Sequence, residues 1–378
     1  MRLLKGHNIL RHLATTTISF AVVAFFVTAT LNISFLNPIA VAFEDFSITD
    51  IFYQMFDATG NPRKSKIITI VDMTELRDRS DIAMLIHEIE DLHPKVLGID
   101  MVFEGLKCDS AGDNMIRDVA KEYDNTVYSY KLLNYNRGQY TTEVHSFFTP
   151  VIRVTEGFTN FERKLYGGIK REISIGQKTM SKIKPSFSLL TANKYAEEQV
   201  MQLEDRQFQI NYTPTDFNEI SYKEISETPE LIEDRIVLLG ATKEEVDMHY
   251  TPLGKKPGVV LQAYSIETMI NQKEIHTASI WEIISITFIM VFLTELIQVA
   301  YENYIEKRKN VFIRFFGSTE MALNLLTFLL MFVWLSIFFL LFYWFQYSIN
   351  LLWAFSGMAF LDTSRQFYDT LIKTLDIR

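Results

Sequence analysis

Two short apolar runs in the middle of the chain each end in an aspartate. Asp72 closes the run KIITIVD and Asp100 closes the run KVLGID, and both runs have the nearly continuous apolar composition of a strand buried on both faces. In an open parallel sheet, ligands bind outside the carboxyl ends of the strands. The two carboxylates therefore stand where a polar ligand or a metal ion would be held.

A third apolar run adds further polar side chains. Residues 236–239 are followed by a Gly-Ala-Thr turn that ends at Thr242, and then by a polar loop with Asp247 and His249. These three residues join the two aspartates as candidate ligand-binding residues, although no firm third ligand for a metal accompanies Asp247 and His249. The alternative is that each aspartate caps a following helix or turn, because Asp is common at such positions without any other function. Both interpretations are open at this point.

Catalytic motifs are absent from the sequence. It contains no Walker A phosphate loop, no G-x-G-x-x-G, no H-E-x-x-H, no paired C-x-x-C and no G-x-S-x-G. The single cysteine, Cys108, cannot form a disulfide within the chain and is most simply an inert side chain. We therefore expect no enzyme activity, no catalytic residue, no metal site and no cofactor.

Strands and helices alternate around these candidate residues. Residues 81–92 have apolar positions at the spacing of an amphipathic helix and lie between the two strands that end in aspartate, which makes a parallel crossover unit. We expect further helices at residues 113–123 and 186–198, strands at 126–133, 208–212 and 236–239, a short element at 222–225 and a helical run from residue 261. The fold class is an α/β domain with a mainly parallel sheet.

A long apolar segment precedes this domain. Residues 13–36 follow Arg2, Lys5 and Arg11 and, at about 24 residues, are long enough to cross a hydrocarbon core of roughly 30 Å. The alternative is a cleaved signal peptide with an A-x-A-like site at residues 40–42. The apolar region of a signal peptide usually has about 7 to 15 residues, so an uncleaved membrane anchor is the preferred interpretation.

Two more apolar segments follow the domain, at residues 280–300 and 321–361. The second has 41 residues without Lys, Arg, Asp or Glu and would measure about 60 Å as one helix, so it must fold back on itself. Polar residues near Gln346 mark the turn and give spans at residues 321–344 and 347–361. The fold class therefore includes α-helical transmembrane spans, one N-terminal and three C-terminal.

Two polar side chains, Glu295 and Gln298, lie inside the second span. An ionisable residue within a membrane is costly and indicates a functional role, although so near the end of a span it can also snorkel or bond to another helix.

Basic residues determine the orientation of this four-span chain. Those near the N-terminus, between residues 307 and 314, and from Arg365 onward all fall on one side of the membrane, which is the cytoplasmic side. The segments are a cytoplasmic N-terminus (1–12), the first span (13–36), an outer domain (37–279), the second span (280–300), a basic cytoplasmic loop (301–320), the last two spans (321–344 and 347–361) and a cytoplasmic tail (362–378).

The outer domain carries the negative charge of the chain. The whole sequence has a net charge of −9, and residues 37–279 hold 27 Lys and Arg against 38 Asp and Glu, which gives −11. An acidic domain argues against nucleic acid as a partner.

Four segments of the outer domain resemble the second type of CHASE domain. They are IITIVD (67–72), HPKVLGIDMVF (93–103), GFTNFERKLYGGIKRE (157–172) and the stretch from DRIVLLGAT to SIETMI (234–270), which has its strand, GAT turn, Asp, TPLG and PGV in the order of that family. The resemblance covers roughly residues 40–275. It implies an extracytoplasmic sensory module in the inner membrane of a bacterium, with three spans after the domain.

Two departures from that family bear on function. The Trp-Pro-rich stretch before the first helix is replaced by residues 73–81, and only 17 residues follow Leu361, where such proteins commonly continue into a cyclase or kinase. The resemblance therefore implies a sensor that binds an unknown small ligand or periplasmic protein and relays the signal to a separate cytoplasmic protein. The alternative is a structural or assembly subunit of a membrane complex, and homo-oligomerisation is open.

Overall fold

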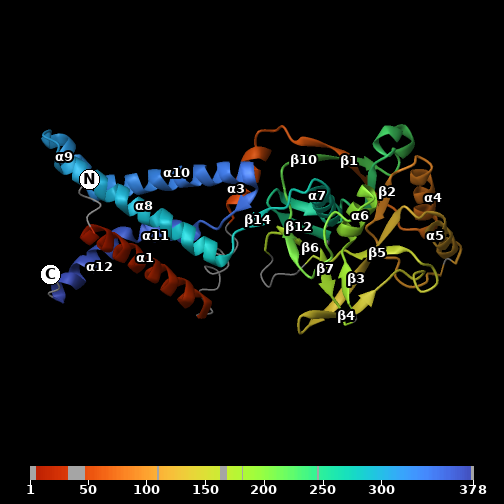
Figure 1. Cartoon of the computed structure of the whole chain (residues 1–378). Helices are drawn as coiled ribbons and strands as arrows, with labels where there is room; N and C mark the ends of the chain where they lie inside the picture. Colours follow the sequence, from red (N-terminus) through yellow and green to blue (C-terminus); the bar gives the residue numbers. More distant parts are fainter. Residues whose placement is uncertain are drawn as a thin grey trace. The chain divides into compact units, whose positions relative to one another are not determined.

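The structure is a computed structural model of the whole chain, and it describes residues 6–32, 47–108, 110–161, 168–180, 182–244 and 247–375. The chain forms two compact units (Figure 1). We call residues 50–275 the α/β unit, and residues 1–49 with 276–378 the helical unit. The boundary falls within helix α3 (Ile48–Asp57).

A seven-stranded sheet forms the centre of the α/β unit. Its strand order is β10-β1-β11-β2-β3-β4, and β5 also pairs with β3. Every pairing is parallel except the one between β3 and β4. The strands are β1 (Arg63–Asp72), β2 (Val96–Ile99), β3 (Thr126–Asn136), β4 (Gln139–Val144), β5 (Thr155–Phe158), β10 (Thr215–Ser221) and β11 (Ile236–Gly240). The prediction of a mainly parallel α/β sheet is confirmed.

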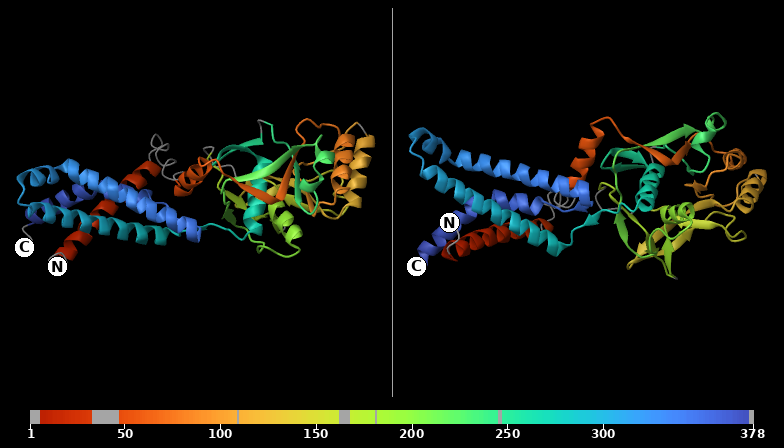
Figure 2. Two further views of the ribbon diagram at one scale, coloured as in Figure 1. Left: turned by 90° about the horizontal axis from the view of Figure 1, so that it is seen from above. Right: turned by 45° about the horizontal axis from the view of Figure 1, so that its top comes forward.

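Helices cover both faces of this sheet (Figure 2). One face carries α4 (Arg79–Glu90) and α5 (Ser110–Glu122), and the other carries α6 (Phe187–Ala196) and α7 (Gly258–Ile270). Side chains alternate accordingly along β11, since Val237 and Leu239 belong to the core under α4 and α5 whereas Leu238 faces α6. All three are completely buried, as expected for a strand covered on both faces.

Short elements fill the loops of the α/β unit. Three two-stranded pairs lie beside the main sheet, formed by β6 (Glu172–Ser174) with β9 (Gln207–Gln209), β7 (Gly176–Lys178) with β8 (Ile183–Pro185), and β12 (Met248–Thr251) with β13 (Gly254–Pro257). Two 3₁₀ turns, η2 (Ile225–Glu227) and η3 (Pro229–Leu231), precede β11. The turns and pairs bring the loop with Asp247 and His249 to the start of α7.

Two sequence predictions differ from the structure in this unit. The expected strand at residues 208–212 is only the three-residue β9, outside the main sheet. The strand that pairs with β1 at the edge of the sheet is β10, with the polar sequence TDFNEIS, which has two apolar residues, Phe217 and Ile220, and both are buried. An edge strand has one solvated side, so the apolar signal that reveals a central strand is missing there.

The helical unit contains, among the residues that the structure describes, three helices long and apolar enough to cross a membrane. They lie in α1 (Gly6–Asn32), α8 (Ile280–Glu306) and α10 (Glu320–Phe345). Ser279 caps α8, because its hydroxyl accepts from the Glu282 amide and the Glu282 carboxylate accepts from the Ser279 amide. A short helix, α9 (Val311–Gly317), joins α8 to α10.

A third C-terminal span was expected at residues 347–361, and the structure differs there. The segment contains β15 (Tyr347–Ser348), which pairs with β14 (His276–Thr277), and the eight-residue helix α11 (Leu352–Ala359). At 1.5 Å per residue α11 measures about 12 Å, which is too short to cross a bilayer. The chain leaves the helix at Phe360 and continues as α12 (Leu361–Thr374), so the expected tail is helical.

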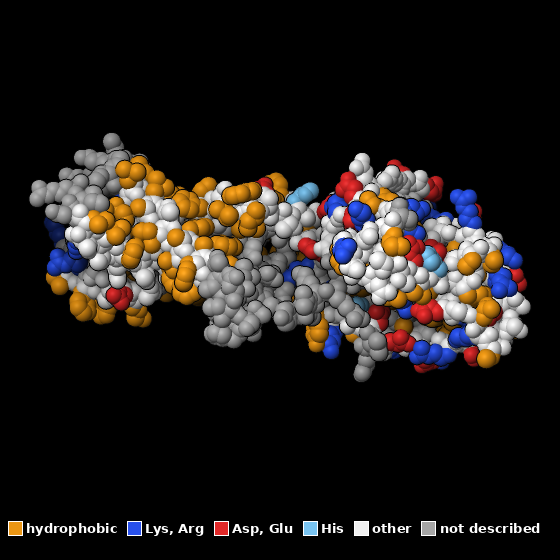
Figure 3. Space-filling model, turned by 90° about the horizontal axis from the view of Figure 1, so that it is seen from below, with side chains coloured by type: hydrophobic (Ala, Val, Ile, Leu, Met, Phe, Trp, Pro, Cys, Tyr) orange, Lys and Arg blue, Asp and Glu red, His pale blue; other side chains and the backbone are white. Residues whose placement is uncertain are grey.

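The surface of the helical unit is apolar. Figure 3 shows hydrophobic side chains over the described part of this unit, whereas charged side chains cover the α/β unit. On α10, large residues such as Phe328, Leu329 and Phe332 are more than half exposed. An apolar surface of this extent is favourable in contact with lipid and unfavourable in contact with water.

Candidate functional site

Asp72 lies at the carboxyl end of β1 and is almost completely buried, with 6% of its surface exposed. Its Oδ1 accepts hydrogen bonds from the amides of Thr74 at 3.0 Å and Thr242 at 3.2 Å, and its Oδ2 pairs with Lys243 Nζ at 2.7 Å. Burial raises the pKa of this carboxyl, but the bonds from Lys243, Thr74 and Thr242 outweigh burial and hold the pKa well below its ordinary value. Asp72 is therefore a carboxylate that ties the end of β1 to the loop after β11.

Thr242 belongs to the same cluster. Its hydroxyl donates to Glu219 Oε1 on β10 at 2.8 Å, so the cluster connects the ends of three neighbouring strands. The acceptors of Asp72 are engaged by protein donors, which supports the capping interpretation for this aspartate.

Asp100, Asp247 and His249 come together at the next strand end. Asp100 follows β2, and its amide donates to the Leu239 carbonyl of β11 at 2.9 Å. Asp247 lies against the first residue of α7, where a Cβ added to Gly258 would lie 2.5 Å from Asp247 Oδ2. His249 Nε2 is 3.4 Å from Asp247 Oδ1. Glycine at position 258 therefore makes room for the carboxylate at the start of the helix.

The electrostatics of Asp100 differ from those of Asp72. Burial, and then the negative charge of Asp247, raise the pKa of Asp100 to about 7. Lys131 acts in the opposite direction but forms its ion pair with Glu104, at 3.1 Å. Asp100 can therefore gain or lose a proton near neutral pH, which is a property of sensing and acid–base sites and also of some buried structural carboxyls.

The five candidate residues thus form two neighbouring groups at the carboxyl edge of the sheet. Asp72 and Thr242 lie at the ends of β1 and β11, and Asp100, Asp247 and His249 lie where β2 meets the start of α7. Within the described ranges, no three His, Cys, Asp or Glu side chains gather in the manner of a metal site. Carboxylates, a hydroxyl and an imidazole can instead bind a polar ligand through hydrogen bonds.

Glu295 and Gln298 belong to a polar centre inside the helical unit. Glu295 is 1% exposed, and its two oxygens contact His12 Nδ1 of α1 at 3.1 Å and Arg365 Nη2 of α12 at 2.5 Å. Arg365 also donates to Gln298 Oε1 at 3.0 Å, and Gln298 donates to the Thr327 hydroxyl of α10 at 2.6 Å. The polar centre, defined as these five side chains, joins four helices.

The sequence indicates only the α8 half of this polar centre. It places His12 in the segment before the first span and Arg365 among the basic residues that set the orientation. The signal that could have found them is the three-residue spacing of Glu295 and Gln298, which puts both on one face of α8 and calls for a buried partner.

The comparison with family models gives a match over residues 21–295, to the CHASE2 domain. The match covers the end of α1, all of the α/β unit and the first part of α8. This chain belongs to the CHASE2 domain family. The CHASE2 domain is a sensory domain, which indicates a sensory role for the α/β unit, and together with the apolar helices the match fits a membrane protein.

No curated protein and no solved structure matches the chain. The CHASE2 match includes the five carboxyl-edge residues and ends at Glu295 in the polar centre.

Proposed function

We propose that this CHASE2 protein is a sensor anchored in the cytoplasmic membrane of a bacterium, with the α/β unit outside. The observation that carries the proposal is the family match, which contains a complete α/β unit flanked by apolar helices long enough to cross a membrane. A sensory domain held between two such helices can pass a change in its packing to the other side of the membrane.

The carboxyl-edge residues are part of this proposal. Asp100, Asp247 and His249 present a titratable acid, a second carboxylate and an imidazole at the start of α7. The α7 helix is followed within ten residues by α8, so a change at its start has a short covalent route to the apolar helix. Asp72 and Thr242 stiffen the neighbouring strand ends.

A separate cytoplasmic protein is the proposed receiver of the signal. Phe367 and Leu371 on α12 and Leu375 at its C-terminal cap recur every four residues, and each is at least 40% exposed. Side chains at this spacing lie on one face of a helix, and an exposed apolar face of this kind suits docking of a protein partner.

The placement of the α/β unit can be tested with the native thiol. Cys108 is exposed, and the sequence contains no other cysteine. Spheroplasts of bacteria that express the chain are treated with a membrane-impermeant maleimide before and after lysis. We expect Cys108 to be labelled fully before lysis.

The matched control moves the thiol to the loop between α9 and α10. A Cys108→Ser, Ser318→Cys variant places an exposed cysteine there, and we expect labelling only after lysis. The proposed orientation would be wrong if the Ser318→Cys thiol were labelled in intact spheroplasts while Cys108 of the unchanged chain were not. The sensor function that depends on this orientation would then also be wrong.

A further inference from the structure

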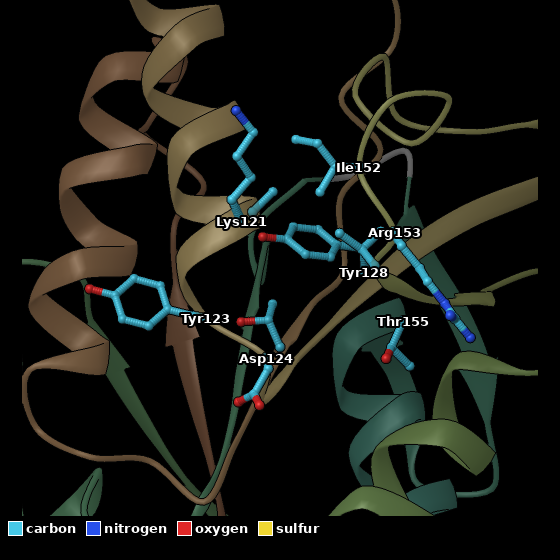
Figure 4. Close-up of a pocket in the computed structure, with 10 residues that line it drawn as sticks. Lys121, Tyr123, Asp124, Tyr128, Ile152, Arg153 and Thr155 are labelled. Carbon is cyan, nitrogen blue, oxygen red and sulfur yellow. The ribbon is translucent and has the colours of Figure 1, made fainter.

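A pocket of about 340 Å³ opens at the amino ends of two strands of the α/β unit, away from the carboxyl-edge residues (Figure 4). Its walls come from the end of α5, the start of β3 and the segment leading into β5. The volume lies at the lower end of the range for small-molecule sites.

The floor of the pocket contains a hydroxyl without a partner. Tyr128 is 1% exposed, and its hydroxyl forms no hydrogen bond with any residue that the structure describes. Its ring packs edge-on against Phe148, with the ring centroids 5.1 Å apart, which fixes the side chain. Figure 4 shows this hydroxyl directed toward α5 between the two sides of the pocket. A buried hydroxyl without a partner is costly, and a ligand atom that accepts its hydrogen bond would remove that cost.

The protonation state of Tyr128 fixes which partner it needs. Burial, and then the nearby charge of Glu90, raise the pKa of the phenol above its ordinary value. The group is therefore a neutral donor at physiological pH and selects a ligand that presents an acceptor.

Two cations stand on opposite sides of the opening. Lys121 lies on α5 and Arg153 lies before β5; both are exposed, and neither forms an ion pair within the described part of the chain (Figure 4). Asp124 is the acid in the described lining, so the two cations outnumber it. Long unpaired side chains of this kind can close over a bound anion.

We propose that this pocket binds a short dicarboxylic acid. One carboxylate pairs with Arg153 and the other with Lys121, a carboxylate oxygen accepts from Tyr128, and the carbon chain lies against Ala120 and Ile152. This proposal rests on the sensor function and adds to it a second ligand site, separate from the carboxyl-edge residues, but binding to the purified chain does not depend on how the chain is oriented in a membrane. Failure of dicarboxylate binding is therefore distinguishable from failure of the proposed sensor function.

The test is calorimetric titration of the full chain, in detergent, with succinate and glutarate. Butyrate, which has one carboxylate, and inorganic phosphate are the comparison ligands. We expect both dicarboxylates to bind, and to bind at least about tenfold more tightly than either comparison ligand, because each charge-assisted contact contributes roughly that factor.

Variants of the pocket sharpen the test. We expect Lys121→Gln and Arg153→Gln each to weaken succinate binding about tenfold or more, whereas Lys178→Gln, which removes an exposed lysine on β7 outside the lining, leaves it unchanged. Tyr128→Phe should weaken binding about two- to tenfold without lowering the melting temperature of the free chain, since the lost hydroxyl has no partner there.

Three results would overturn the proposal. They are the absence of binding by both dicarboxylates at millimolar concentration, binding of phosphate or butyrate as tight as that of succinate, and succinate affinity that is the same in Lys121→Gln and Arg153→Gln as in the unchanged chain.

Discussion

Two aspartates at equivalent strand ends have opposite electrostatics in this protein. Asp72 accepts from a lysine and two backbone amides and stays ionised, whereas for the side chain of Asp100 the structure records no hydrogen bond, and a second carboxylate lies nearby. The difference comes from their neighbours, because the loop after β11 directs Lys243 to one strand end and Asp247 to the other. Of these two aspartates, Asp100 is therefore the one that titrates near neutral pH.

Asp100 should make the stability of the α/β unit depend on pH. Its folded-state pKa of about 7 lies above the value of about 3.9 for an unfolded aspartate, so the folded chain binds the extra proton between these values. The contribution of Asp100 is fully favourable below pH 4 and is lost as the pH rises to about 7. At about 1.4 kcal/mol per pKa unit, the difference of about 3 units corresponds to a loss on the order of 4 kcal/mol.

Asp100→Asn removes this titration while keeping the shape of the side chain. We expect the variant to melt above the unchanged chain at pH 8, and the difference between the two to shrink toward pH 4. Melting temperatures measured between pH 4 and 8 give the comparison. Asp205→Asn, at an exposed position, is the control and should follow the unchanged chain. Parallel curves for the Asp100 variant and the unchanged chain would contradict the assignment.

At the scale of elements, close backbone approach positions the helices on the sheet. A Cβ added to Gly157 of β5 would lie 2.4 Å from the backbone of Phe187, the first residue of α6. Glycine here lets α6 rest directly on the edge of the parallel sheet, and the Phe187 ring is completely buried. In the helical unit, the polar centre positions the apolar helices against one another. It does so through hydrogen bonds and ion pairs and not through close backbone approach.

Glu295 and Arg365 should be strongly coupled. Glu295→Gln leaves Arg365 with Glu302, which is 2.8 Å away, and Arg365→Gln leaves the buried Glu295 carboxylate with His12. Each single variant should cost up to roughly 3 to 5 kcal/mol, whereas the double variant removes both charges and should recover part of that loss. The measurement is a double-mutant cycle on unfolding of the full chain in detergent. Additive losses would show that the two side chains act separately.

An exposed pair between two of the same helices provides the control. Arg11 and Asp369 lie 2.8 Å apart, with side chains 41% and 43% exposed. Arg11→Gln should cost at most about 1 kcal/mol, because water already solvates both groups.

Most elements could be predicted from the sequence, and the exceptions have physical causes. The central strands and α4, α5 and α6 carry clear apolar periodicity, because each buries a defined face. The edge strand β10 lacks this signal, and the segment at residues 347–361 is apolar enough for a span but is interrupted by β15 and by the end of α11 at Phe360. The hydropathy of a segment indicates whether its environment is apolar. It does not indicate whether the segment forms one continuous helix.

At the scale of the whole molecule, each of the two units has a hydrophobic core of its own. The core under α4 and α5 contains residues such as Ile86 and Leu239, and the core of the helical unit contains residues such as Met290 and Ala354. Each unit therefore has its own source of stability.

Heating the full chain in detergent should then give two transitions in differential scanning calorimetry. Asp100→Asn should shift only the transition of the α/β unit, and Glu295→Gln only that of the helical unit, because each substitution acts on one unit. A single transition that both variants move would show that the units unfold as one.

The sequence by itself determined the α/β class, the apolar helices on either side and the resemblance to the CHASE2 family. These features depend on local composition and on the order of residues along the chain, both of which can be read from the amino-acid sequence. Only the tertiary structure decided that Asp72 is engaged by Lys243 while Asp100 lies near Asp247, that Glu295 pairs with His12 and Arg365, and that Tyr128 lines one pocket with Lys121 and Arg153. Such partners are separated by between 7 and 283 residues, and folding of the chain brings them together.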